Sequence, residues 1–317
     1  MKRKITIFVI SLILLSLLSS CELFTERADD ITVYALFVGL DYADEAGFDS
    51  LNTLDGTIRD AKEMAAASAS LYSYYGIGFE GYLSIQSQED ATDEEDALYP
   101  SKEKILQRIA AIKERMDDND IFIFYFAGHG IEDETERGYL IVASDDDSVE
   151  YETLGVGDLS SALNSLPGNS VVILDSCYSG EHVSPYPLYS DNVVETFNPH
   201  TFSLVASKDD QTSIELELDN GETHGYFTLA FLHRLGWVHT ETTTANLYYG
   251  DNSSDKRAYS VTGHIEKHEG EMITLEDIAD SIRNKEVNSL YDVSWFISQN
   301  YQLSSGPTGI ILFTERW

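Results

Sequence analysis

The chain has 317 residues and a formal net charge of −35 at pH 7, with a sequence pI of about 4.3. Nucleic acid and anionic lipid surfaces would repel so acidic a protein, whereas a cationic substrate would be attracted to it, so we expect no nucleic-acid partner. It has two cysteines, Cys21 and Cys177, which excludes a disulfide framework.

The N-terminus has the pattern of an export signal. Three basic residues at positions 2–4 precede the apolar run Ile5–Leu18, which is short for a membrane span. The following Leu18-Ser19-Ser20-Cys21 resembles a bacterial lipobox, in which the cysteine is acylated. This pattern predicts a signal peptide over 1–20, a lipidated tether over 21–30 and a membrane-anchored lipoprotein of the cell envelope, facing the periplasm or the exterior. An ordinary secretory signal or a short membrane anchor is the alternative.

Predicted strands and helices alternate along residues 31–317, which we interpret as one domain. Apolar runs predict strands, and periodic segments with capping residues predict helices. The predicted strands are Ile31–Leu40, Gly81–Ile85, Asp120–Gly130, Gly138–Ala143, Val171–Gly180, Thr201–Ala206 and Gly306–Phe313. The predicted helices are Leu54–Tyr75, Ser101–Met116, Gly157–Leu166, His224–Leu232 and Thr274–Ile282. This order predicts a three-layer α/β/α sandwich with a mostly parallel central sheet, interrupted by a polar insertion at about 238–271.

Two of the predicted strands end at residues that have reactive side chains. His129 lies between two glycines after the apolar run of Asp120–Gly130, and Cys177 follows Val171–Leu174. Catalytic groups collect at the carboxyl ends of parallel strands. An imidazole can take the proton of a thiol or stabilise the thiolate, which makes a nucleophile. Taken singly, a buried cysteine or histidine is more often a structural residue, so it is the pair that suggests catalysis.

The segments Y-F-A-G-H-G-I and V-V-I-L-D-S-C-Y-S-G resemble the histidine and cysteine motifs of caspase-like cysteine peptidases, and of the metacaspase branch in particular. The segment from Leu54 to Ala61 is similar to the L-x-G-x-x-x-D-A segment of that branch. The resemblance implies that Cys177 attacks the scissile carbonyl and that His129 protonates the leaving amine. It also implies that the N–H groups of Cys177 and Gly130 bind the oxyanion. The sequence shows no third residue to orient the imidazole.

The same resemblance implies cleavage after Arg or Lys. Asp175 and Glu215 fall at positions that line the specificity pocket in metacaspases, and Asp209 and Asp210 are nearby in the segment K-D-D-Q-T-S. A buried carboxylate prefers a cation and can hold a guanidinium bidentately. The expected partner is therefore a peptide or protein with basic residues.

We expect no metal and no cofactor, with Ca²⁺ as the alternative. Many metacaspases bind activating Ca²⁺ through an aspartate run, of which only Asp158 stands at the corresponding place. Asp145, Asp146 and Asp147 are further oxygen donors, but a solvated turn explains them equally well, and Ca²⁺ needs six or more oxygens.

Two other functions stay open. One is a caspase-fold binding or scaffold lipoprotein without proteolytic activity, and the other is a lipoprotein whose acidic surface binds cationic polymers. For a peptidase specific for basic residues, Glu181–Ser207 contains no Lys or Arg and is not a site of self-cleavage. We expect any such cleavage in an exposed loop at Lys256-Arg257.

Overall fold

The computed structural model describes residues 31–43, 50–87, 99–132, 138–146, 148–182, 200–208, 210–248, 256–266, 273–284, 302–303 and 311–313. The predicted signal peptide, the tether and Cys21 lie outside these ranges, as do Asp147 and Asp209. None of the described helices is both long and apolar enough to cross a bilayer.

Eight described strands form the central sheet. Their order is β12 (Lys256–Ile265), β11 (Trp237–Tyr248), β2 (Gly78–Gln86), β1 (Thr32–Leu40), β3 (Ile121–Ala127), β7 (Asn169–Asp175), β8 (Thr201–Val205) and β14 (Gln302–Leu303). The strands from β11 to β8 run parallel to their neighbours, and β12 and β14 add an antiparallel strand at each edge.

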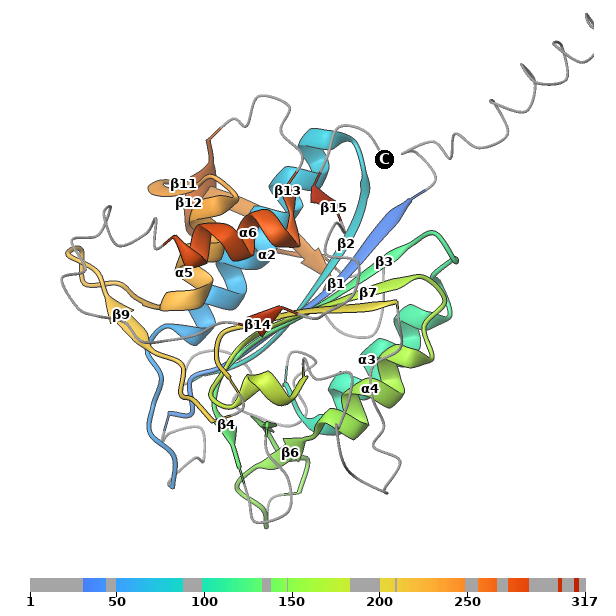
Figure 1. Ribbon diagram of the computed structural model, residues 1–317, viewed down its shortest axis with the longest axis vertical. Coiled ribbons are helices and arrows are strands. Elements are labelled where there is room, and N and C mark those ends of the chain that lie inside the picture. Colours follow the sequence, from blue (N-terminus) through green and yellow to red (C-terminus); the bar gives the residue numbers. More distant parts are fainter. Residues whose placement is uncertain are drawn as a thin grey trace, which may run out of the picture.

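Helices cover both faces of this sheet (Figure 1). On one face lie α2 (Thr57–Tyr75), α5 (Tyr226–Arg234) and α6 (Leu275–Arg283), and on the other lie α3 (Lys102–Lys113) and α4 (Val156–Asn164). Strand β3 is apolar along its whole length because both of its faces are covered, and every one of its residues is buried. The predicted three-layer sandwich with a mostly parallel sheet is confirmed.

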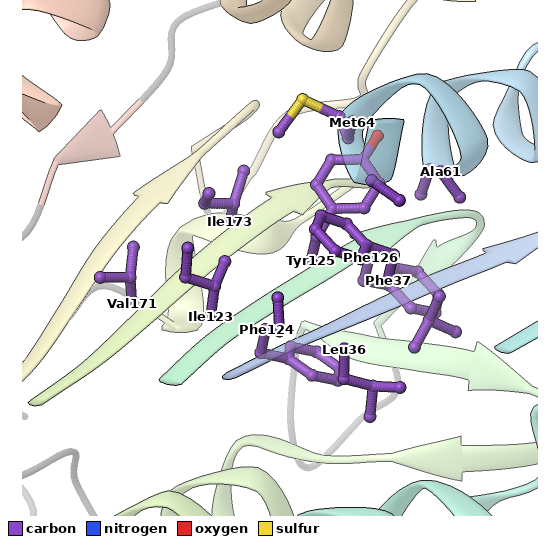
Figure 2. Close-up of a cluster of buried hydrophobic side chains, with 14 of the residues drawn as sticks. Leu36, Phe37, Ala61, Met64, Ile123, Phe124, Tyr125, Phe126, Val171 and Ile173 are labelled. Carbon is purple, nitrogen blue, oxygen red and sulfur yellow. The ribbon is translucent and has the colours of Figure 1, made fainter. Parts of the chain in front are cut away.

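Part of the hydrophobic core lies between α2 and the middle of the sheet (Figure 2). Ala61 and Met64 of α2 lie over a row of paired residues from β1, β3 and β7, namely Phe37, Tyr125 and Ile173. All five side chains are almost completely buried. This packing fixes the positions of the carboxyl ends of β3 and β7. The candidate residues His129 and Cys177 follow these two ends.

The polar stretch predicted as an insertion contains β11 and β12, which form a long antiparallel hairpin that extends the sheet beyond β2. Most of β11 is partly or fully exposed, so it lacks the apolar run by which the inner strands were predicted. Lys256 and Arg257, expected in an exposed loop, are instead the first residues of β12 and pair with Tyr248 and Leu247. Cleavage there would require this end of β12 to leave the sheet.

The end of the chain also differs from the prediction. Of the predicted strand Gly306–Phe313, the described part is β15 (Ile311–Phe313). It pairs with β13 (Ile273–Thr274) in a separate two-stranded sheet and not with the central sheet.

Candidate active site

His129 and Cys177 follow neighbouring parallel strands at the same edge of the sheet. Ala127 at the end of β3 pairs with Asp175 at the end of β7, and each candidate lies two residues further on. The two segments also touch, because a Cβ atom added to Gly130 would lie 2.0 Å from the carbonyl oxygen of Cys177. Position 130 therefore needs glycine, and the backbones that bear the two candidates are in direct contact.

Three hydrogen bonds hold His129. Its N–H donates to Tyr42 Oη at 2.9 Å, and its carbonyl accepts from the N–H of Ile141 at 3.0 Å. Its ring Nε2 lies 2.6 Å from the carbonyl oxygen of Asn52. A carbonyl only accepts, so Nε2 must carry the hydrogen, and in the neutral ring Nδ1 then keeps its lone pair. The imidazole is thus fixed in a tautomer that can take a proton at Nδ1.

The carbonyl of Asn52 is the orienting group that the sequence analysis did not find. It lies before α2, far from His129 in the chain, and it is a backbone atom. Every residue has a carbonyl, so no pattern of side chains could have revealed this one.

Tyr42 supports the histidine from the end of β1. Its side chain is fully buried, its ring centroid lies 4.6 Å from that of His129, and its hydroxyl donates to the carbonyl of Ile141 at 2.8 Å. Its φ of 56° is in the left-handed region, which costs a bulky residue about 1–2 kcal/mol. The surrounding contacts hold this strained residue at the point where β1 meets the histidine segment.

Cys177 is half-buried, in a turn held against the segment that follows β8. Its Sγ accepts a hydrogen bond from the N–H of Ser213 at 3.4 Å, and the next residue, Tyr178, donates its N–H to the carbonyl of Gln211 at 2.8 Å. Burial raises the pKa of the Cys177 thiol, and the Ser213 N–H opposes this only in part. Burial likewise lowers the pKa of His129. The resting pair is therefore a neutral thiol and a neutral imidazole.

Two residues before Cys177, Asp175 lies close to two other carboxyl groups, and we call Asp60, Asp175 and Glu215 the acidic cluster. Asp175 is buried and accepts hydrogen bonds from Ser213 Oγ at 2.5 Å and from Thr228 N and Oγ1 at 3.0 and 2.8 Å. Burial, together with the neighbouring charge of Asp175, raises the pKa of Asp60 and of Glu215, and burial also raises the pKa of Asp175 itself. The ionised forms of these carboxyl groups are therefore energetically disfavoured, and a bound cation would stabilise them.

Gly225 joins the members of this cluster. It belongs to β10 (Thr223–Gly225), where it pairs with Glu215 of β9 (Glu215–Glu217). Its N–H donates to Asp60 Oδ2 at 2.7 Å, and a Cβ atom at this position would lie 2.1 Å from Asp175 Oδ2. The small β9–β10 sheet thus closes over the two buried aspartates.

The structure brings together some of the predicted substrate-binding residues. Asp175 and Glu215 belong to the acidic cluster, whereas Asp209 lies outside the described residues. Asp210 is exposed, and within the described ranges no hydrogen bond or ion pair links it to the other two. Asp60, the aspartate of the D-A pair in the Leu54–Ala61 segment, is a further member of the acidic cluster that was not among the predicted substrate-binding residues.

Comparison with known proteins identifies the family. The family model described as "Caspase domain" matches residues 32–248. The chain belongs to the caspase-domain family. Its members are cysteine peptidases, and the matched range of this caspase domain includes both His129 and Cys177. No curated protein matches the chain.

A solved structure shows the same fold. It is the crystal structure of protein GSU0716 from Geobacter sulfurreducens, with a TM-score of 0.50 and 15% sequence identity. The match covers 87% of this chain and 94% of that one. At this level of identity the likeness concerns the fold alone.

Three of the four aspartates considered for Ca²⁺ lie within the described residues and have partners in the caspase domain. Asp158 accepts from the N–H of Gly155 at 3.3 Å, at the start of α4, and pairs with Lys102 Nζ at 2.6 Å. Asp145 accepts from Ser101 Oγ at 2.5 Å, and Asp146 accepts from the N–H of Ser148 in a tight turn. These contacts give all three aspartates a structural role.

The neutral resting pair of the caspase domain leads to a prediction about the thiol. We expect the rate of Cys177 alkylation by iodoacetamide to rise with pH and to inflect above about pH 8.5, because burial opposes the thiolate. Mass spectrometry of the alkylated protein over a pH series measures this. An inflection below pH 7 would show instead a thiolate–imidazolium pair.

Proposed function

We propose that the protein is a cysteine endopeptidase that uses Cys177 and His129 and cleaves after Arg or Lys. The observation that supports this best is the placement of His129. Its Nε2 is occupied by the carbonyl of Asn52, so its Nδ1 is the nitrogen left for proton transfer at the sheet edge where Cys177 lies.

In the proposed mechanism, Sγ of Cys177 attacks the scissile carbonyl while its proton passes to Nδ1 of His129. The oxyanion accepts hydrogen bonds from the N–H groups of Cys177 and Gly130, whose backbones are in contact. His129 then gives its proton to the leaving amine, which departs and leaves a thioester on Cys177. Water hydrolyses this acyl-enzyme with His129 as the base.

The acidic cluster supports the proposed specificity. Glu215 is the half-exposed member and can meet a basic side chain directly, while Asp175 and Asp60 are buried. The raised pKa values of all three groups reflect an environment in which a further negative charge is unfavourable. An aspartyl side chain would add such a charge, whereas an arginyl or lysyl side chain would compensate it.

Matched fluorogenic peptides that differ only in the residue before the cleaved bond test this proposal. We expect the arginyl peptide to be hydrolysed with a kcat/KM at least about 100-fold above that of the aspartyl peptide. We also expect Glu215→Gln to raise KM for the arginyl peptide about 10-fold with little change in kcat, since it removes a charge that contacts bound substrate.

Glu217→Gln is the matched control, because Glu217 lies on the same strand and is exposed. It should leave KM within about 2-fold of the unsubstituted protein, as is usual for an exposed surface charge. Preferred hydrolysis of the aspartyl peptide, or equal effects of the two substitutions, would contradict the specificity.

We also propose that Cys21 is lipidated and that the peptidase is tethered to a membrane of the cell envelope. The support is the basic, apolar and small-residue pattern that ends at Cys21. Mass spectrometry of the N-terminal peptide decides this: an unmodified Cys21, or a chain that still begins at Met1, would contradict it.

A further inference from the structure

Two histidines and a glutamate meet on the α2 side of the sheet. We call Glu63, His224 and His239 the histidine–glutamate cluster, and their ligand atoms all lie within 4.8 Å of one another. They come from α2, β10 and β11, so three separate parts of the chain converge there. The cluster includes neither His129 nor Cys177 and plays no part in the proposed peptidase mechanism.

The cluster is buried and contains polar atoms without partners. The side chains of Glu63 and His224 are 1% and 0% exposed, and that of His239 is 8% exposed. Nε2 of His224 and Oε1 of Glu63 have no hydrogen-bond partner in the described part of the chain. Unpaired buried polar atoms are unfavourable, and two of them in one cluster of metal-ligating side chains indicate a missing ligand.

His224 is already in the form that binds a metal. Its Nδ1 lies 2.8 Å from Asp60 Oδ1, and an ionised Asp60 accepts the hydrogen of Nδ1, which leaves the lone pair on Nε2. A carboxylate behind a ligand histidine is the usual arrangement in zinc sites, because it sets the tautomer and raises the basicity of the ring.

We propose that Glu63, His224 and His239 bind one Zn²⁺ ion, with water at the fourth position. Two imidazoles and one carboxylate form a ligand set that zinc commonly uses. Ligand atoms around tetrahedral zinc lie about 3.3 Å apart, so small side-chain adjustments bring the cluster to this geometry. His239 Nε2 now lies 2.9 Å from Glu63 Oε2, and its proton moves to Nδ1 of the same ring as zinc takes its place.

A zinc ion here would stabilise the position of the β9–β10 sheet next to the acidic cluster. It would connect α2, β10 and β11 through Glu63, His224 and His239. The residue after His224, Gly225, donates its N–H to Asp60 and packs against Asp175. The site would therefore hold the β9–β10 sheet in place without touching the substrate.

The test uses the purified full chain with Cys177→Ala, so that zinc bound by the thiol is not counted. We expect about one zinc per chain by elemental mass spectrometry. After removal of the metal, Zn²⁺ at about a hundred times its Kd should raise the melting temperature by at least about 5 °C. His239→Gln should weaken binding by more than about 100-fold, and Asp60→Asn by about 10–100-fold.

His264→Gln is the matched control, since His264 lies on the paired strand β12 and outside the cluster. It should retain full zinc binding. Because a substitution could also disturb folding, Co²⁺ provides a second measurement: its visible absorption should show nitrogen and oxygen ligands in the parent chain and in His264→Gln, but not in His239→Gln. No bound or stabilising zinc in the parent chain, or equal losses in the two histidine variants, would overturn the proposal. Peptidase activity is not involved, so this result is independent of the proposed function.

Discussion

Replacing Cys177 with alanine is expected to lower kcat/KM for an arginyl peptide by at least about 10⁴-fold while leaving the protein folded. In the proposed mechanism the sulfur of Cys177 bonds to the substrate, so no neighbouring group replaces it. The stability effect should be small, since the side chain is half-buried and its described hydrogen bond is a weak one from the N–H of Ser213. Fluorogenic hydrolysis and thermal unfolding measure the two quantities.

Ser176→Ala provides the control for this change. Ser176 precedes Cys177 and is buried, and its hydroxyl has no partner among the described residues. Its removal should leave kcat/KM within about 3-fold, because no hydrogen bond is lost. If Cys177→Ala kept its activity, the hydrolysis would come from another site. An unsubstituted protein without activity on any of the peptides would favour the alternative of a binding or scaffold protein.

Gly130→Ala is expected to lower kcat/KM for the same peptide by about 100-fold or more. The added methyl group would lie 2.0 Å from the carbonyl oxygen and 2.9 Å from the carbonyl carbon of Cys177, far inside van der Waals contact. The obstacle is backbone, which cannot rotate away as a side chain can, so the two segments must separate by about 1 Å. Displacements of that size between reacting groups cost about 100-fold in rate.

Gly78→Ala tests whether any glycine substitution would have this effect. Gly78 begins β2, and the nearest atom to an added Cβ is the Oγ1 of Thr32 at 3.1 Å, on a side chain that can rotate. Activity should stay within about 2-fold of the parent. Circular dichroism of both variants shows whether a loss of activity comes from altered site geometry or from a loss of folding. A fully active Gly130→Ala would exclude close contact of the two segments in the active protein.

The part of the fold that could be predicted is the part buried on both faces. Strand β3 is a continuous apolar run and β7 contains one, because helices cover both faces of the sheet there, and α3 begins at a clear capping residue, Ser101. The hairpin β11–β12 was missed because its exposed positions are polar and its buried ones are widely spaced. Its strands are defined by pairing with each other and with β2, which a local pattern does not reveal.

The candidate site shows the same division. His129 and Cys177 were predicted because their residue types and positions after apolar runs are local features. The orienting carbonyl of Asn52 has no side-chain signature, and the histidine–glutamate cluster joins residues as far apart as Glu63 and His239. Such contacts depend on how the strands are ordered in space, and no short motif spans them.

The strand order also determines how the chain would respond to a cut. Strands β1, β2, β3 and β7 come from residues before 182 and occupy the middle of the sheet, whereas β8, β14, β11 and β12 come from residues after 200 and flank them on both sides. The part of the chain after residue 200 thus contacts the part before residue 182 on both sides of the sheet. On one side the contact is made by the β7–β8 hydrogen bonds, and on the other by the packing of α2 against the β11–β12 hairpin. A chain nicked anywhere between 182 and 200 would therefore migrate as one body in native conditions, and its two halves would part only in denaturant.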